Sequence, residues 1–580
     1  MRYKLSLLAT GLLIANAASA ATEINLYKQP AAYLLKQLST QADSKTKVVT
    51  VRTDVDFNHT AHTRIQQTYN DIPVWDATGV IHTPNSKRSM RSALASIGAN
   101  STMNGVIYEG LEKDLAVAPA FKNTQSQQLK ALQASKNLHA RRTRMAVNAF
   151  KNEKSQPIIF IDDDKQAHYA YLTSFTYLSA SAAHRPTSIV DAVTGKVYRT
   201  WEGILSASAQ EESAVNAARA KVRQMLDGDD QLPKEFYDIK AGGIGGNAKM
   251  GEWIYDDLAG NKPALDVKAI DMNYEMIPGN PYKVTFCVLM NNDIMVFDVA
   301  NDNIAMHVCA TNSKMHNGVA WLSLDKGQTR WKDDEMNDGY SPSLDAFYAA
   351  TIIKSFYQDW YNVPALIDAG GSPMKFMMRA HFGRRFDNAF WDGKQMTFGD
   401  GGSMFYPMTS VGVTAHEISH GFTDTHSHID YSYPQMGALH ESFSDMAAVT
   451  VENYMTGTNG WDLGREIKKD EGALRYLDNP TKDGRSIDHM KDFDATEAHG
   501  GAGVTNKAFY LLATTKGWTT RKAFDVWVKA NMHYWTSSMS TFNEAACGVV
   551  AATKDYGYEV ADVRIAFAKV GIDTDTCAVL

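Results

Sequence analysis

The chain has 580 residues, of which 44% are hydrophobic and 21% are charged, and its formal net charge is -7. Single cores rarely grow beyond about 300 residues, so this length predicts several domains of ordinary globular composition. Because the charge is mildly negative and no basic patch stands out, we expect no nucleic-acid partner.

The first twenty residues have the parts of a signal peptide. Arg2 and Lys4 give a positive end, Leu5 to Ala15 gives a short apolar segment, and Ala18-Ser19-Ala20 is a small-residue cleavage site. The apolar run is too short to span a bilayer, and no later segment is long and apolar enough. The sequence therefore predicts a soluble, secreted protein and no membrane association.

Residues 21–204 precede the main domain as a separate region. Lys47 to Thr53 and Val80 to His82 carry β-branched residues typical of strands, and Gln125 to Ala146 has a polar helical pattern. Asp191 to Lys196 predicts a turn between two strands. The region is either a propeptide or an extracellular binding domain that stays attached.

Residues 205–240 are a boundary that is rich in Ala, Glu, Asp and Lys and helical in pattern, with a break at Asp227 to Asp230. The glycine-rich run from Ala241 to Gly246 follows and predicts a flexible segment that a protease could cut. We expect maturation near the bond between Lys240 and Ala241.

The main domain changes character half-way. Strand patterns occur at 253–255, 282–288 and 294–298, and a helical pattern at 343–360. Beyond residue 411 helical patterns predominate, at 413–423, 437–455, 506–514, 521–534, 541–556 and 561–570. We therefore expect an α+β fold in which a β-rich lobe (241–398) and a helical lobe (399–580) meet at the helix 413–423, with a cleft between them.

The helix predicted at 413–423 carries His416, Glu417 and His420 in the pattern H-E-x-x-H. The two histidines lie one turn apart on one helix face, where both can reach a zinc ion at about 2.0–2.1 Å. Glu417 is rotated by about 100° from His416, so it is badly placed as a ligand but well placed to take a proton from a water beside the metal. The alternative is an amphipathic helix with ordinary histidines.

A second motif, some twenty residues downstream, argues against that alternative. Glu441 offers a third ligand. Asp445 lies one helical turn further on, where a carboxylate can accept the free ring N–H of a zinc-bound histidine and fix its tautomer. Two histidines, one carboxylate and an open position for water are typical of a catalytic zinc site.

The four cysteines are Cys287, Cys309, Cys547 and Cys577. An even number in an exported chain favours disulfides, and there is no C-x-x-C spacing to indicate a cysteine zinc site. Four cysteines allow three pairings, between which the sequence alone does not choose.

H-E-x-x-H followed by G-x-x-x-E-x-x-x-D resembles the thermolysin family of zinc metallopeptidases. Residue by residue, the sequence is most similar to the secreted elastase and vibriolysin branch of that family. The resemblance covers about 241–577. In the precursor, residues 62–75 resemble the fungalysin/thermolysin propeptide motif, and 168–172 with 188–198 resemble a PepSY module. Further blocks in family order are Asn388–Gly393, Phe398–Gly401, Gly472–Tyr476, Asp483–Ile487 and Asn506–Leu512.

The resemblance implies a two-lobed thermolysin-like catalytic domain behind an α+β propeptide with modules at 21–110 and 111–204. It implies a secreted zinc endopeptidase that cuts protein and peptide substrates before bulky apolar residues. The enzyme would be made as an autoprocessed zymogen, with its own propeptide as chaperone and inhibitor, and we expect a monomer. The implied disulfides are sequential, Cys287–Cys309 and Cys547–Cys577.

The resemblance also implies roles for individual residues. Tyr431 and His499 would stabilise the oxyanion, with Asp494 orienting His499. The residues that would grip substrate are Asn388 and Ala389 along the peptide backbone, Arg475 at a substrate carbonyl, and Val413 and Leu474 in the pocket after the cut.

Three departures from the family pattern affect these expectations. His440 stands where Asn is usual; it could still hydrogen-bond the second zinc histidine, with an altered pH response. Gly500-Gly501-Ala502 follows His499, so polar support there is expected to be weaker. The acidic calcium positions are here Gly412, Val449 and Gly460, leaving Glu452 alone, so we do not expect calcium at that site.

Two other functions are considered. An exported zinc-binding or adhesive protein with this fold but no proteolysis would be expected to lose Glu417, which is present. An exopeptidase would need extra acids to capture a substrate amino terminus, and we find no such signature.

Overall fold

The structure is a computed structural model that describes residues 21–30, 33, 45–84, 100–116, 121–178, 183–203, 236–277, 280–300, 303–310, 319–322, 334–383, 385–494 and 498–577. The expected signal peptide and most of the boundary at 205–240 lie outside these residues. No helix within them is long and apolar enough to cross a membrane.

Residues 21–203 build one nine-stranded sheet in the order β1-β5-β4-β6-β7-β8-β9, with β3 also paired to β4 and β2 to β3. A single parallel pair, Val74 with Ile159, joins the first half of this sheet to the second. The longest helix begins with a capping box between Thr124 and Gln127. The elements are β1 (Thr22–Asn25), η1 (Leu26–Lys28), β2 (Thr46–Val55), β3 (Ala61–Tyr69), β4 (Ile72–Thr83), β5 (Thr102–Glu109), α2 (Leu111–Ala116), α3 (Gln125–Thr143), η4 (Val147–Ala149), β6 (Lys151–Ile161), β7 (Ala167–Leu178), β8 (Ala183–Asp191) and β9 (Val197–Gly203).

In the part that the structure describes, the β-rich lobe contains two sheets and one long helix. The first sheet runs β11-β10-β12-β13-β16-β17 and is closed by a β10–β17 pairing, and the second runs β15-β14-β18-β20-β19. A disulfide links Cys287 of β13 to Cys309 of β16. The elements are β10 (Tyr237–Asn247), β11 (Gly251–Tyr255), β12 (Leu265–Ile277), β13 (Asn280–Val288), β14 (Ile294–Asp298), β15 (Asn303–Ile304), β16 (Met306–Ala310), β17 (Ala320–Leu322), α5 (Pro342–Tyr361), β18 (Phe376–Phe382), β19 (Ala389–Trp391) and β20 (Met396–Gly399).

The glycine-rich run at 241–246 is not a flexible segment, contrary to our expectation. It is a buried part of β10 that pairs with β11, and the expected helical pattern before it gives way to strand from Tyr237. A side chain at Gly242 would meet the carbonyl oxygen of Tyr255 at 2.1 Å. The glycine there permits close packing of two strands rather than mobility.

Each helix predicted in the helical lobe is present to within a few residues at its ends, while the short helices and the two-stranded sheet of this lobe were not predicted. The stretch predicted as one helix at 521–534 divides into α10 and a π-helical turn, η7, closed by the bond from the Trp535 N–H to the Ala530 carbonyl. A second disulfide joins Cys547 to Cys577. The elements are α6 (Val411–His426), α7 (Pro434–Thr456), β21 (Asp462–Leu463), β22 (Arg475–Tyr476), η5 (Pro480–Asp483), η6 (Met490–Asp492), α8 (Ala498–Gly501), α9 (Gly503–Ala513), α10 (Thr520–Lys529), η7 (Ala530–Tyr534), α11 (Phe542–Asp555) and α12 (Val560–Lys569).

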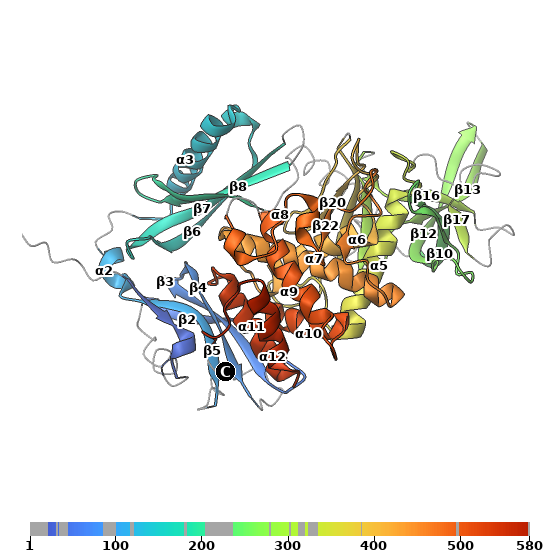
Figure 1. Cartoon of the computed structure of the whole chain (residues 1–580). Coiled ribbons are helices and arrows are strands. Elements are labelled where there is room, and N and C mark those ends of the chain that lie inside the picture. Colours follow the sequence, from blue (N-terminus) through green and yellow to red (C-terminus); the bar gives the residue numbers. More distant parts are fainter. Residues whose placement is uncertain are drawn as a thin grey trace, which may run out of the picture.

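One continuous core runs through both lobes, from Ala241 in β10 to Ile572 behind α12. The helices α5, α6 and α7 lie in the middle of the molecule, and the first strands of the precursor lie beside α11 and α12 (Figure 1). The α+β architecture with a helical second lobe is therefore as predicted, and α6 and α7 pack against each other within this core.

Candidate metal centre

Helix α6 carries the first two candidate ligands. It begins at Ser410, whose side chain accepts a hydrogen bond from the Val413 N–H. His416 and His420 lie one turn apart, and their Nε2 atoms are 3.0 Å from each other. Both side chains are buried, so they meet a common point inside the protein rather than the solvent.

Glu441 on α7 completes the group. Its Oε2 lies 3.4 Å from Nε2 of His416 and its Oε1 lies 3.6 Å from Nε2 of His420. Donors on a tetrahedron with bonds of about 2.0–2.1 Å are separated by roughly 3.4 Å, so these distances suit zinc. The buried Oε2 has no hydrogen-bond partner in the described part of the chain, as expected for an atom reserved for a metal. These three residues fit a zinc ion.

Neighbouring histidines favour the ionised form of Glu441. Burial by itself would raise the pKa of this carboxyl, but His499, His420 and His416 hold it well below its usual range. Nε2 of His499 lies 3.4 Å from Glu441 Oε2, and 57% of the His499 side chain is exposed. His499 therefore reaches the centre from its open side.

Asp445 lies behind His416. Its Oδ1 is 2.9 Å from Nδ1 of His416, and it also accepts two hydrogen bonds from Arg475, from Nε at 2.8 Å and Nη2 at 2.6 Å. Asn506 donates a further bond at 2.8 Å. A fully bonded, buried carboxylate of this kind can fix the orientation of His416.

Glu417 lies on α6 beside the ligands without belonging to their group. Its side chain is buried, and this burial raises its pKa to about 7. A carboxylate whose pKa is near neutrality can both accept and return a proton at working pH. Its environment therefore suits a general base.

The other side of the centre is occupied by Tyr431 and His440. The Tyr431 hydroxyl donates to Glu441 Oε1 at 2.6 Å. Nδ1 of His440 lies 2.7 Å from Nδ1 of His420, and its Nε2 lies 3.1 Å from Oδ1 of Asp424. We did not predict Asp424 as a site residue; its signal was the spacing, since it follows His420 by four residues on the same face of α6.

The residues expected to grip substrate are only partly brought together. Ala389 lies in β19, which pairs with β20 and is an edge strand of its sheet as far as the structure describes it. Val413 is buried on α6, and Leu474 is half-buried beside Arg475. Arg475 is engaged with Asp445 in this state. Asp494 is exposed and, with Gly500, lines a cavity of about 550 Å³.

More acidic residues lie near the expected calcium positions than the sequence implied. Glu452 accepts a bond from the Gly460 N–H at 2.8 Å. Burial, together with Asp462 and Glu466, raises its pKa, so Glu452 is not alone. Arg465 supplies positive charge here, since its Nε donates to Asp462 Oδ1 at 3.1 Å.

Known proteins share both the catalytic and the precursor parts. Residues 256–424 match the family model of the thermolysin metallopeptidase catalytic domain, residues 427–572 its alpha-helical domain, and residues 44–87 the Fungalysin/Thermolysin Propeptide Motif. A zinc metalloproteinase from Legionella pneumophila is 37% identical over 541 residues, which cover 91% of this chain and 88% of that one. The chain belongs to the thermolysin family. A neutral protease from Vibrio proteolyticus is 33% identical over 514 residues, covering 88% of this chain and 71% of that one.

Membership of the thermolysin family makes this chain a zinc metalloendopeptidase with a propeptide, and it supports the vibriolysin-like branch. Among solved structures, the precursor of protealysin from Serratia proteamaculans is similar over 48% of this chain and 87% of that chain, with a TM-score of 0.38 and 23% identity. The match to the propeptide motif confirms the interpretation of residues 44–87 as part of a propeptide rather than of an attached binding domain.

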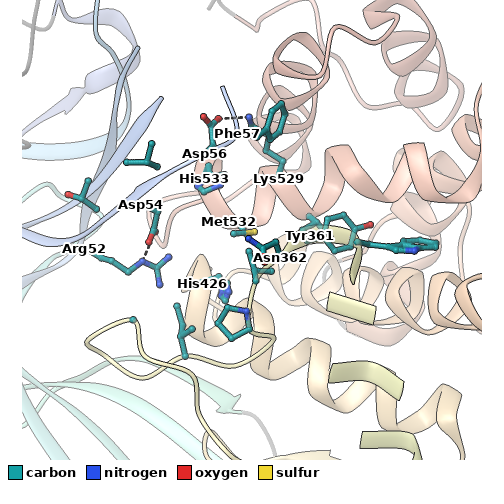
Figure 2. Close-up of a pocket in the computed structure, with 18 of the residues that line it drawn as sticks. Arg52, Asp54, Asp56, Phe57, Tyr361, Asn362, His426, Lys529, Met532 and His533 are labelled. Atoms are coloured by element: carbon teal, nitrogen blue, oxygen red, sulfur yellow. Dashed lines mark hydrogen bonds and ion pairs between the residues drawn. The ribbon is translucent and has the colours of Figure 1, made fainter. Parts of the chain in front are cut away.

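The precursor lies against the helical lobe, where its strand β2 reaches the C-terminal end of α6. A cavity of about 780 Å³ separates β2 from α5, α6 and α10 (Figure 2). On one wall Arg52 pairs with Asp54, and on another Nζ of Lys529 binds Oδ2 of Asp56 at 2.5 Å. Both Asp56 and Lys529 are almost fully buried, so the propeptide is tied to the helical lobe by an internal ion pair.

Proposed function

We propose that His416, His420 and Glu441 hold the catalytic zinc and that Glu417 is the general base of a proteolytic zymogen. The proposal is carried by one observation: three buried donors at tetrahedral spacing, with an unliganded carboxylate of raised pKa beside them. Bound zinc would polarise the scissile carbonyl and acidify the attacking water. Glu417 takes the proton of that water and passes it to the leaving amine.

Tyr431 and His499 are the donors for the oxyanion. His499 approaches Glu441 from the exposed side, where a substrate would enter, and the hydroxyl of Tyr431 is already within hydrogen-bonding distance of the same carboxylate. During the reaction both would donate to the oxygen on which negative charge develops. Asp494 would orient His499, and Asp445 and His440 would orient His416 and His420.

Substrate would lie along the edge of β19. Backbone and side-chain groups of Asn388 and Ala389 would extend the peptide there as an added strand. Val413 and Leu474 would form an apolar pocket for a bulky side chain just after the cut. Arg475, fixed by Asp445 on one edge of its guanidinium, would offer the remaining N–H groups to a substrate carbonyl.

The propeptide would inhibit by holding loops on both sides of this site. Asp76 of β4 accepts a bond of 2.7 Å from the Tyr433 hydroxyl, and Arg199 of β9 lies over the Tyr433 ring at 4.9 Å. Tyr433 is two residues from Tyr431. Arg185 of β8 donates to the carbonyl of Asp392, directly after β19, at 3.1 Å. Release of these contacts would free both the oxyanion donor and the substrate edge.

Maturation is autocatalytic in this proposal and follows export by the signal peptide. A cut near Lys240 would fall in β10, where Tyr237 to Ala241 pairs with β12, so that part of the strand must first detach.

Arg465 replaces calcium as the cation beside Asp462, and we expect the melting temperature of the enzyme to be unchanged when EGTA replaces calcium chloride. The product would act as a monomer.

Casein hydrolysis tests the proposal. Secreted wild type is compared with Glu417→Gln, each with and without 1,10-phenanthroline, and the mass of each secreted product is measured. We expect only the wild type to cleave casein, the chelator to stop it, and Glu417→Gln to accumulate as unprocessed precursor. Folded, zinc-loaded wild type that cleaves nothing would contradict the proposal and favour a zinc-binding protein without proteolysis.

A further inference from the structure

A chain of hydrogen bonds leads away from the candidate ligand His420. It passes to Nδ1 of His440 at 2.7 Å, from Nε2 of His440 to Oδ1 of Asp424 at 3.1 Å, and from Oδ2 of Asp424 to Nε1 of Trp391 at 2.8 Å. His440 and Trp391 are fully buried, and 28% of the Asp424 side chain is exposed. Both oxygens of the Asp424 carboxylate are therefore hydrogen-bonded, one to His440 and the other to Trp391.

The direction of this chain follows from its ends. The indole N–H of Trp391 is only a donor, and a carboxylate is only an acceptor, so His440 must present a proton on Nε2 to Asp424. Nδ1 of His440 is then an acceptor, and Nδ1 of His420 must donate to it. That leaves Nε2 of His420, the atom that faces His416 and Glu441, without a proton and free to bind a metal.

We propose that Asp424 is a positioning residue that acts through His440 to fix the tautomer of His420, and so determines how firmly the centre holds zinc. The inference rests on the proposed zinc ligands. The family pattern favours an asparagine at 440. Such an asparagine would not couple residue 424 to His420, because its amide oxygen can accept from His420 whatever residue 424 does.

We expect Asp424→Asn to reverse the direction of the hydrogen bonds from His420 through His440 to residue 424. The new amide oxygen would accept from Trp391, and the NH2 group would then face Nε2 of His440, which would have to accept. The proton of His440 would move to Nδ1 and compete with that of His420, placing a proton on the ligand atom. Loss of the charge and of the order should together weaken zinc retention by about tenfold, as for other partners of metal-bound histidines.

The experiment uses the full chain carrying Glu417→Gln, so that no variant digests itself. Zinc loss to a fluorescent chelator is timed for four proteins: Glu417→Gln alone, with Asp424→Asn, with His440→Asn, and with both. We expect Asp424→Asn to speed zinc loss about tenfold when His440 is present and less than about twofold when Asn is at 440.

Asp562→Asn is the matched control. Asp562 is a partly exposed helical acid that accepts from Nε1 of Trp518 at 2.9 Å, like Asp424 from Trp391. Its replacement should leave zinc loss unchanged. An equal effect of Asp424→Asn in both backgrounds, or no effect in either, would overturn the inference while leaving the zinc site intact. Failure of Glu417→Gln itself to retain zinc would overturn the proposed function and the inference with it.

Discussion

Two buried histidine pairs in this molecule share the same Nδ1-to-Nδ1 contact but differ in ring orientation and in surroundings, with interplanar angles of 30° for His420–His440 and 77° for His62–His82. In the catalytic part His420 and His440 meet Nδ1 to Nδ1 at 2.7 Å, and in the propeptide His62 and His82 do the same at 2.7 Å. Each pair ends on a carboxylate, Asp424 in the first and Asp56 in the second.

The free ends of the two pairs decide what each can do. His420 faces a second histidine and the carboxylate of Glu441, which together suit a metal. The far nitrogen of His82 instead meets Oδ1 of Asn104 at 2.6 Å, and His62 stacks on His533 of the helical lobe at 4.1 Å. The same hydrogen-bonded unit thus serves a reactive centre in one place and a docking surface in the other.

The largest expected difference between the two histidine pairs is tested by removing one histidine from each pair. His420→Gln should abolish zinc binding and lower kcat/KM for casein by at least about 10³-fold, because it removes a ligand. His62→Gln should reduce the yield of processed enzyme and leave its kcat/KM unchanged, because the propeptide is then gone. Zinc content and casein hydrolysis measure both. Lower kcat/KM in processed His62→Gln enzyme would show that the pairs do not differ in this way.

Lys529→Met tests the docking surface next to the second pair. Nζ of Lys529 binds Asp56 at 2.5 Å and Asp555 at 3.0 Å in a buried position. Without it, Asp56 stays buried with His62 and the backbone N–H groups of Asn58 and Thr60 but with no cation from the helical lobe, and loss of one partner of a buried pair costs about 3–5 kcal/mol. We expect a lower urea midpoint for the Glu417→Gln precursor. Adding Asp56→Asn should recover part of the loss, and an unchanged midpoint in Lys529→Met would contradict the buried ion pair.

A smaller effect should come from pH. Burial lowers the pKa of His62, of His82 (to about 3) and of His533 in the docked state. The ordinary pKa of histidine is about 6.5. Below that pH these histidines bind protons more readily when the propeptide is undocked than when it is docked. Docking is therefore fully stable above about pH 6.5 and weakens as the pH falls; for His82, whose docked pKa is about 3, the loss is about 2 kcal/mol at pH 5. The charged and polar groups around them are Asp56, Arg64, Lys529, Tyr534 and Asp555.

His533→Phe is the matched variant for this pH effect. Phe can keep the stack on His62 but cannot titrate, and among the described residues Nδ1 of His533 has no hydrogen-bond partner to lose. Urea unfolding of the Glu417→Gln precursor at pH 8, 6 and 5 should show a smaller loss of stability in His533→Phe. An identical pH dependence of both proteins would exclude His533 as one of the groups responsible.

Much of the catalytic part could be predicted because its signals are local. The four-residue spacing of His416 and His420 predicts a shared helix face, and the structure places their Nε2 atoms 3.0 Å apart. The helices after residue 411 follow from their periodicity. The stretch predicted as one helix at 521–534 is helical as far as Tyr534, but its last turn is π-helical, and Arg64 of the propeptide donates to the carbonyls of Met532 and Trp535 there.

The glycines at 241–246 show the limit of composition as a signal. Glycine favours flexible chain and close packing alike, and the neighbour that decides between them, Tyr255, is distant enough in sequence to be missed. Asp424 is a similar case: its spacing from His420 places it on the ligand face of α6, but what it binds is decided only when His440 from α7 is placed against it.

The sequence alone determined the family, the candidate ligands with their base, the α+β class and the presence of a propeptide. Residue types at fixed local spacing carry that information directly. Only the tertiary structure decided which distant groups meet: Asp56 with Lys529, which are 473 residues apart, and Asp424 with His440. Such pairs depend on how whole helices and sheets pack, and many different pairings are compatible with the same local pattern.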